Sequence, residues 1–276
     1  MPTDSFDLRA VEAAIAGTEF AGYLMHFPTV ASTNDLALEA AQAGTRHGVW
    51  IADEQTAGRG RGSHTWHSAG GEGLYLTALI SPPIPTMTAL RLSLRTAIAV
   101  QSAISLVTGF RRPQEIDIRW PNDLLLNGRK CGGVLIETAA KPGEGGGLSM
   151  LRHAIIGIGI NCNQTRFPLE LDSIATSLRR ELPAPRATVP REPLAAAVLV
   201  ALDEEIRLLI RGWRGTNNRR DRPVSEYSTW FRGKRVRVEE GGYTGITAGV
   251  DRNGFLLVDG DDGIVHTVLS GGVREP

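Results

Sequence analysis

The chain has 276 residues, 42% of them hydrophobic and 22% charged, which is typical of a globular protein large enough for a full core. Lysine plus arginine equal aspartate plus glutamate at 30 each, so no net charge attracts nucleic acid or an anionic membrane. The sequence shows no secretory signal, no apolar run of membrane-spanning length, and only two cysteines, Cys131 and Cys162, without zinc or disulfide spacing, so we expect a cytoplasmic protein with no membrane partner.

The first third of the chain predicts two helices and three strands, at 7–16 (helix), 23–27 (strand), 33–43 (helix), 48–54 and 73–80 (strands). Gly44 follows the second helix as its C-terminal cap. The segment 73–80 is apolar at nearly every position, which favours a central strand in a sheet covered on both faces.

The middle of the chain predicts a long amphipathic helix at 88–107, followed by four strands at 116–120, 124–126, 131–138 and 154–161. Asn127-Gly128 indicates a tight hairpin turn between two of these strands. We expect a surface loop at 141–147, a proline-rich connector at 183–190 and a helix at 192–211.

The character of the sequence changes after about residue 232. Short β-type segments at 234–239, 244–250, 254–259 and 263–269 are separated by glycine-containing turns. They predict a small antiparallel barrel attached to an α/β body. We therefore expect two domains, residues 1–230 and 231–276.

Residues 58–66, here called the Gly/Arg loop, are the most informative segment of the chain. The sequence Gly58-Arg59-Gly60-Arg61 alternates glycine and arginine directly after a predicted strand. Glycines allow a sharp turn with several N–H groups pointing into one concavity, and arginines add forked donors. The segment therefore predicts an anion-binding loop, of the kind that holds phosphate or carboxylate.

Ser32-Thr33-Asn34-Asp35 opens the second predicted helix. The simpler interpretation is that Ser32 or Thr33 caps this helix while Asp35 favourably faces the helix dipole. Hydroxyl and N–H groups at the same place could also bind a small polar ligand, and the two interpretations are compatible.

Trp120-Pro121-Asn122-Asp123 joins two predicted strands. An Asx turn is the default interpretation, but an amide and a carboxylate at a strand end could also face a nucleotide or its magnesium.

Lys130 precedes Gly132-Gly133, and glycines inside a strand favour the close approach of another group. Most such lysines lie at solvated hairpin tips, whereas a lysine beside such a gap could bridge a carboxylate and a phosphate.

Gly157 and Gly159 lie in a strand that ends at Asn161, a residue that is either a ligand contact or a turn residue. They lack the third glycine and the helix of a dinucleotide-binding motif. The six histidines show no metal-ligand spacing, so we expect no metal site built from protein groups alone.

In their order along the chain, these motifs resemble the biotin protein ligases. The resemblance rests on Ser32-Thr33-Asn34, Gln55 with the Gly/Arg loop and Trp66, the Trp120–Asp123 motif, Lys130 to Gly133, Gly157 to Asn161, and Ala175-Thr176-Ser177-Leu178. It extends from about residue 24 to the C-terminus. It implies an ATP-dependent ligase that activates biotin as biotinyl-5′-AMP and transfers it to a lysine of a biotin carboxyl carrier protein.

The resemblance also implies a fold. We expect a mixed β-sheet flanked by helices, similar to that of class II aminoacyl-tRNA synthetases, and an SH3-like C-terminal barrel. Because the motifs begin about thirty residues from Met1, no room is left for the DNA-binding domain of many members, and we expect no DNA partner. The carrier protein of a biotin-dependent carboxylase is the expected partner, and both a monomer and a homodimer remain open.

Site residues follow from the same resemblance. The expected biotin-binding residues are Ser32, Thr33, Asn34, Gln55, Gly58, Arg59, Gly60, Arg61, Lys130 and Gly133. The expected ATP-binding residues are Arg59, Arg61, His64, Trp66, Asn122, Asp123, Lys130 and Asn161, with Mg²⁺ arriving on ATP near Asp123. Lys130 and Arg61 are the expected catalytic residues, because their charges offset the repulsion between biotin carboxylate and α-phosphate.

One departure from the family pattern is clear. The family loop has Gly and Arg where this chain has Ser63 and His64, which alters the turn after Arg61 and its last anion contact. Two alternatives remain: lipoate or octanoate attachment by the same fold, and a nucleic-acid-binding module without catalysis. The Gln55-containing motif favours biotin, and the zero net charge opposes the nucleic-acid alternative.

Overall fold

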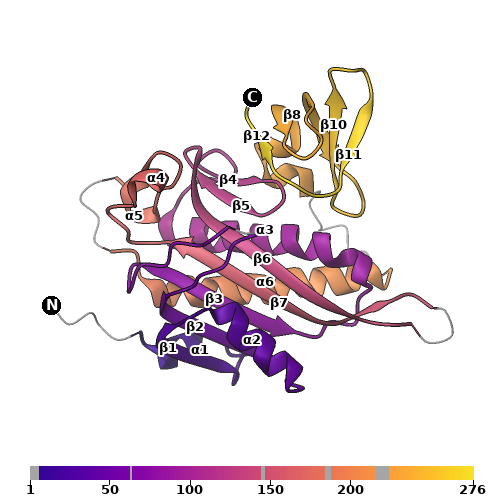
Figure 1. The fold of residues 1–276 in the computed structure, drawn as a ribbon. Coiled ribbons are helices and arrows are strands. Elements are labelled where there is room, and N and C mark those ends of the chain that lie inside the picture. Colours follow the sequence, from indigo (N-terminus) through magenta and orange to yellow (C-terminus); the bar gives the residue numbers. More distant parts are fainter. Residues whose placement is uncertain (1–5, 63, 144–146, 184–187, 216–223) are drawn as a thin grey trace.

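A seven-stranded mixed sheet is the central element of the computed structural model, which describes residues 6–62, 64–143, 147–183, 188–215 and 224–276 (Figure 1). The strands are β1 (Leu24–Val30), β2 (Gly48–Gln55), β3 (Gly73–Ile80), β4 (Ile116–Arg119), β5 (Asp123–Leu126), β6 (Arg129–Lys141) and β7 (Met150–Asn161). Their order is β1-β2-β3-β7-β6-β5-β4. β1 runs parallel to β2, and every other neighbouring pair is antiparallel.

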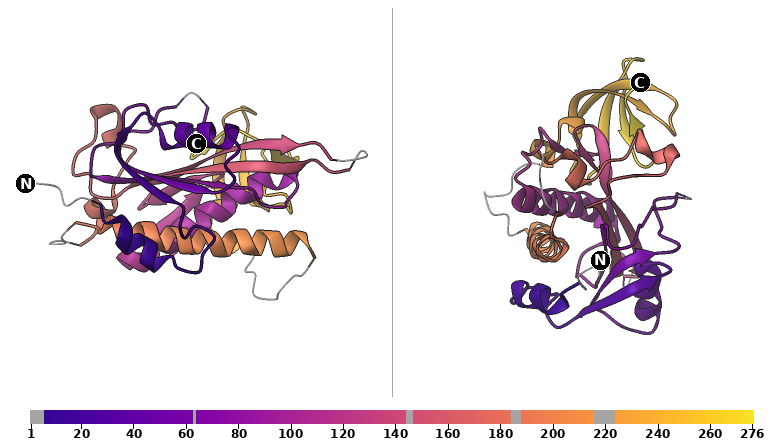
Figure 2. Two further views of the ribbon diagram at one scale, coloured as in Figure 1. Left: turned by 90° about the horizontal axis from the view of Figure 1, so that it is seen from below. Right: turned by 90° about the vertical axis from the view of Figure 1, so that its left-hand side faces the viewer.

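Helices cover both faces of this sheet (Figure 2). α2 (Thr33–Gln42) packs on β2, β3 and β7 from one side, and α3 (Ala89–Thr108) and α6 (Arg191–Trp213) pack together on the other side. α1 (Leu8–Ala14) lies against α6, and Asp7 caps it by accepting the Ala10 N–H at 3.1 Å. Because both faces are covered, all eight residues of β3 are buried, as the apolar sequence predicts.

The segment that contains α3 is apolar over a long stretch, with a mean hydropathy of 1.2 in its most apolar window. By length and composition alone the segment Thr86–Thr108 could cross a membrane, so the statement that no apolar run reaches that length is wrong. Within the protein, however, 65% of its most apolar window is buried. The apolar surface of α3 is thus used by the core it forms with α6, whose buried residues Leu194, Val198, Leu202 and Ile206 recur at helical spacing.

A second, five-stranded antiparallel sheet follows and sits at one end of the first (Figure 1). Its strands are β8 (Arg232–Val238), β9 (Thr244–Val250), β10 (Leu256–Gly260), β11 (Val265–Val268) and β12 (Val273–Arg274), in the order β11-β10-β9-β8-β12.

Two tryptophans hold the sheets together. Trp120, fully buried, donates from Nε1 to the Gly254 carbonyl at 3.0 Å, and Trp230 is buried in the short helix η4 (Thr229–Phe231) that contacts β4, β8 and β9. The C-terminal sheet is therefore fixed beside β4 and β5.

The predicted mixed sheet, flanking helices and small C-terminal β unit are confirmed. β6 and β7 extend beyond their predicted ends because they pair with each other as a projecting arm, where Lys141 faces Met150. α4 (Leu169–Asp172) and α5 (Leu178–Glu181) were missed because four residues are too few for a periodic pattern. Residues 144–146 of the predicted surface loop and 184–187 of the connector lie outside the described residues.

Candidate active site

The Gly/Arg loop is a tight turn closed by backbone hydrogen bonds. The Trp66 N–H donates to the Gly58 carbonyl at 2.9 Å, and the Gly60 N–H donates to the His64 carbonyl at 2.8 Å. Gly62 has φ +66°, in the left-handed region that favours glycine. A Cβ at Gly58 would lie 2.5 Å from the Trp66 carbonyl oxygen, so only glycine fits there. Ser63 lies outside the described residues, whereas His64 is exposed.

A buried polar cluster lies where this loop leaves β2. The Gln55 Oε1 accepts from the Thr33 N–H at 2.9 Å and from the Thr33 hydroxyl at 3.1 Å, while Gln55 Nε2 donates to Ser68 Oγ at 3.0 Å. The Thr77 hydroxyl lies 2.7 Å from both Thr33 Oγ1 and Asn34 Oδ1. Three of the predicted biotin-binding side chains, Thr33, Asn34 and Gln55, therefore form one connected group.

Ser32 occupies the N-cap position of α2 and is buried, but its hydroxyl makes no capping hydrogen bond within the described helix. The prediction that Ser32 or Thr33 is the N-cap of this helix is therefore confirmed for Ser32, although the side-chain hydrogen bond usual at that position does not form. Thr33 already lies inside α2, and its hydroxyl donates to Gln55 instead.

Glycines of the central strand β7 make room for two side chains. A Cβ at Gly157 would lie 2.2 Å from Asn34 Oδ1, and a Cβ at Gly159 would lie 2.6 Å from the Trp66 indole. Real Cβ atoms do not approach that closely, so a larger residue would displace Asn34 or Trp66. β7 is thus the strand against which both Asn34 of the polar cluster and Trp66 of the Gly/Arg loop pack.

A second cluster, of charged groups, lies on β4, β5 and β6. Lys130 Nζ lies 2.5 Å from Asp123 Oδ1, and Arg119 Nη2 lies 2.6 Å from Asp123 Oδ2. Burial raises the pKa of Asp123, but the charges of Lys130 and Arg119 outweigh this effect and hold that pKa below its ordinary value. Asp123 is therefore a buried, ionised carboxylate that holds Lys130 and Arg119 closely, with Arg274 Nη1 farther away at 3.9 Å from Oδ2.

Trp66 joins the two clusters. Lys130 Nζ lies over the Trp66 ring at 5.5 Å from its centre, a cation–π distance. A Cβ at Gly133 would contact both Lys130 Cε, at 3.4 Å, and Trp66 Cζ3, at 3.5 Å. The predicted residues Lys130, Gly133, Trp66 and Asp123 thus meet at one place, at the end of the loop.

The remaining predicted residues have protein partners in this conformation. Arg59 pairs with Asp35 and Glu137, and Arg61 donates to the Gly271 carbonyl of the C-terminal sheet at 2.7 Å.

Asn122 and Asn161 serve as backbone ties in the same way. Asn122 Nδ2 donates to the Val134 carbonyl at 2.5 Å, and Asn161 Nδ2 donates to the Thr176 carbonyl at 3.1 Å. Each of these bonds uses one N–H of the side-chain amide, and a primary amide has a second N–H and an oxygen as well.

Four residues of the site were missed by sequence reasoning: Ser68, Thr77, Arg119 and Glu137. Thr77 had a usable signal, because a hydroxyl in the middle of an otherwise apolar, central strand must find a buried partner. Glu137 had none, since its partners Asn34 and Arg59 are distant in the sequence. Arg119 lies only four residues from Asp123, its partner, but alternation along the strands did not single it out.

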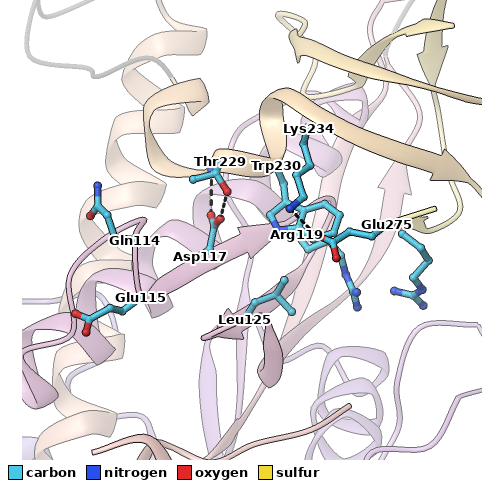
Figure 3. Close-up of a pocket in the computed structure, with 11 residues that line it drawn as sticks. Gln114, Glu115, Asp117, Arg119, Leu125, Thr229, Trp230, Lys234 and Glu275 are labelled. Carbon is cyan, nitrogen blue, oxygen red and sulfur yellow. Dashed lines mark hydrogen bonds and ion pairs between the residues drawn. The ribbon is translucent and has the colours of Figure 1, made fainter. Parts of the chain in front are cut away.

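A cavity of about 370 Å³ adjoins the charged cluster, between β4 and the C-terminal sheet (Figure 3). Arg119 forms part of its wall, beside Trp230, Lys234 and Asp117. The Asp117 carboxylate accepts the Thr229 N–H at 3.2 Å and the Thr229 hydroxyl, and burial raises the pKa of Asp117. The cavity wall carries both acidic and basic side chains, so its charge favours neither an anionic nor a cationic ligand.

Residues 6–62, 64–143, 147–183, 188–215 and 224–276 contain no group of three or more His, Cys, Asp or Glu side chains that could hold a metal ion. Both oxygens of Asp123 are already occupied by cationic partners. Asp123 therefore does not fit the role of a magnesium ligand in this conformation.

The polar cluster and the charged cluster thus lie on either side of Trp66, along the glycine-bearing strand β7. Residues 27–161 match the model of the biotin/lipoate A/B protein ligase family. The bifunctional ligase/repressor BirA of Bacillus spizizenii is 34% identical over 252 residues, covering 90% of this chain and 73% of that protein. The chain belongs to the biotin/lipoate A/B protein ligase family.

Two further relatives extend the comparison. The biotin–[acetyl-CoA-carboxylase] ligase of Mycobacterium tuberculosis is 32% identical and covers 83% of this chain and 80% of its own length. The structure of biotin protein ligase from Aquifex aeolicus in complex with biotin and ATP superposes with a TM-score of 0.69 and 25% identity, covering 92% of this chain and 98% of that one. All three proteins are therefore ligases by name, and two of them are named for biotin.

Proposed function

We propose that this chain is an ATP-dependent biotin protein ligase. The observation that carries the proposal is the proximity of two clusters: the polar group of Thr33, Asn34 and Gln55, and the charged pair of Lys130 with Asp123. Asn34 lies against Gly157 of β7, and Trp66, which Lys130 contacts, lies against Gly159 of the same strand. The full-length relatives named as ligases support the same activity. Biotin suits the first cluster because its ureido ring needs both donors and acceptors.

The reaction has two steps. A biotin carboxylate oxygen attacks the α-phosphorus of ATP, the bond to the β-phosphate breaks, and pyrophosphate leaves with the electron pair, giving biotinyl-5′-AMP. The neutral ε-amine of a carrier lysine then attacks the biotinyl carbonyl, AMP leaves, and the amine releases a proton as the amide forms.

Lys130 supplies the charge for the first step. Both reactants are anions, so a cation between the carboxylate and the α-phosphate lowers the barrier as negative charge builds up on the phosphoryl oxygens. Asp123 keeps the Lys130 ammonium in place without neutralising it, because Arg119 shares the same carboxylate. The Trp66 ring lies against Lys130 Nζ. We expect it to help exclude water from biotinyl-5′-AMP, a mixed anhydride that water would hydrolyse.

Arg61 supplies the second cation of the proposed site. It reaches the α-phosphate once it releases the Gly271 carbonyl, and His64, Asn122 and Asn161 lie toward the nucleotide in the same proposal. We expect the magnesium of MgATP to be held by phosphate oxygens, because Asp123 is occupied.

The proposed partner is the carrier protein of a biotin-dependent carboxylase, with residues 1–230 as the catalytic domain and 231–276 as the C-terminal domain. We propose that the protein works in the cytoplasm as a monomer or homodimer. Cys131 and Cys162 are buried and unpaired, which supports a reducing compartment.

The test is transfer to a carrier, followed by intact mass. Purified protein is incubated with MgATP, a biotin carboxyl carrier domain and either biotin, lipoate or octanoate. A mass increase of one biotinyl group with biotin alone supports the proposal. Modification by lipoate or octanoate instead would assign the chain to the other branch of the family.

A further inference from the structure

The Arg59 side chain binds carboxylates of its own chain. Its Nη1 lies 2.8 Å from Asp35 Oδ1 and 3.2 Å from Glu137 Oε2, and its Nη2 lies 2.6 Å from Glu137 Oε1. This is a forked, two-point contact with Glu137, and the hydrogen bond to Glu137 is the main cause that raises the pKa of Arg59. An incoming anion would have to compete with both of these carboxylates for the guanidinium.

Glu137 also reaches the polar cluster. Its Oε2, which contacts Arg59, accepts the Asn34 Nδ2–H at 2.9 Å. Asn34 in turn meets Thr77 and lies against Gly157 of β7. One carboxylate on β6 therefore contacts both the Gly/Arg loop and the first turn of α2.

The contacts continue until they return to the loop. From Asn34 they pass through Thr77 and Thr33 to Gln55, and Gln55 Nε2 donates to Ser68. The Ser68 hydroxyl then donates to the Trp66 carbonyl at 3.3 Å. The loop is thus attached at its beginning through Arg59 and at its end through Trp66, and the same side chains line the proposed biotin site.

We propose that Glu137 is a positioning residue for ligation, and that Arg59 is the anchor through which it acts and is not an anion ligand. Glu137 holds the loop closed over the polar cluster and fixes the Asn34 amide. Loop closure and biotin binding are thereby coupled through one carboxylate. This inference rests on the proposed biotin ligase function.

The test is a double-mutant cycle of Glu137→Gln, Arg59→Gln and the pair together. Glu137→Gln keeps the volume of the side chain and an oxygen for Asn34, but removes the charge that holds Arg59. Asp261→Asn is the matched control, because Asp261 forms a two-point ion pair with Arg235 on the C-terminal sheet, with both distances 2.6 Å.

Two readouts are measured on each variant. The first is the rate of tryptic cleavage after Arg61 in the ligand-free protein, followed by mass spectrometry, which reports loop opening without any activity. The second is biotin-dependent adenylation, with KM for biotin, kcat, and the fraction of biotinyl-adenylate released to solution.

We expect each single change to speed cleavage after Arg61 and to raise both KM for biotin and the released fraction, by roughly three- to tenfold, while Asp261→Asn changes none of them. Because the two residues act through one contact, the double variant should match the stronger single variant within about twofold. Multiplicative effects, or unchanged cleavage in Glu137→Gln, would overturn the inference. If the unmodified protein shows no adenylation, the proposed function fails, and the cleavage rates still decide whether Glu137 holds the loop.

Discussion

Replacing Lys130 with alanine separates catalysis from stability. Lys130 Nζ lies 2.5 Å from the buried carboxylate of Asp123, yet the Lys130 side chain is 35% exposed. Arg119 remains 2.6 Å from the same carboxylate, so the variant does not leave Asp123 without a charged partner. We therefore expect Lys130→Ala to lower the free energy of unfolding by no more than about 1 kcal/mol.

The effect on adenylation should be much larger. A cation that acts mainly on charge developing at the α-phosphate contributes about 2.7 kcal/mol or more to the transition state, which corresponds to a fall in kcat of at least ~10²-fold. Biotin binding should persist, because Thr33, Asn34 and Gln55 are untouched. The assay is steady-state formation of pyrophosphate, with biotin affinity measured by calorimetry.

Lys234→Ala is the matched control for this prediction. Lys234 is 33% exposed, pairs with Glu275 and lies 4.9 Å from the centre of the Trp230 ring, a setting similar to that of Lys130. It should retain kcat within about twofold of the unmodified protein, since it offers the same kind of surface contact without the reacting groups. A Lys130→Ala enzyme with kcat within a few-fold of normal, or an equal loss in Lys234→Ala, would refute the role of Lys130.

Three further predictions concern the same site. Gly157→Ala should weaken biotin binding by about tenfold, measured by calorimetry, because its Cβ would displace the Asn34 amide from two hydrogen bonds; unchanged affinity would show that Asn34 does not shape the pocket. Arg61→Gly should still form biotinyl-adenylate but release it, because the cation proposed to hold its phosphate is lost, so bystander proteins become biotinylated; an active variant that remains specific for its carrier would contradict the proposed role of Arg61. Asp123 has a lowered pKa in the folded state, so its stabilising contribution is complete above its unfolded value of about 3.9 and is lost as pH falls through the folded value. In urea unfolding between about pH 2 and 6, the stability advantage of the unmodified protein over Asp123→Asn should therefore shrink in acid, and a constant difference would argue against an ionised Asp123.

The elements of the fold were predictable where burial imposes a pattern. β3 carries apolar residues on both of its faces because helices cover both faces of the sheet. The apolar residues of α6 recur at helical spacing because one side of this helix packs on α3. The ends of β6 and β7 were not predictable, since beyond the sheet these strands pair with each other and β7 also bridges to Pro85, a contact between segments distant in the sequence.

In the candidate site, the positions of key glycines were predictable from the sequence, but the partners of the arginines were not. Glycine content indicated where the chain turns sharply or approaches itself closely, and Gly58, Gly157 and Gly159 all lie at such contacts. The partners of the two loop arginines were not predictable, because Glu137 lies 78 residues from Arg59 and Gly271 lies 210 residues from Arg61. A sequence indicates that an arginine needs an anion or a carbonyl, but only the packing of distant strands decides which one it meets.

Pyrophosphate exchange tests the central claim most directly. The purified protein is incubated with ATP, magnesium and labelled pyrophosphate, with and without biotin and with no carrier present. If Lys130 and the polar cluster form the adenylation site, label enters ATP only when biotin is added, and Lys130→Ala slows this exchange by at least ~10²-fold. Folded protein that shows no biotin-dependent exchange would contradict the account.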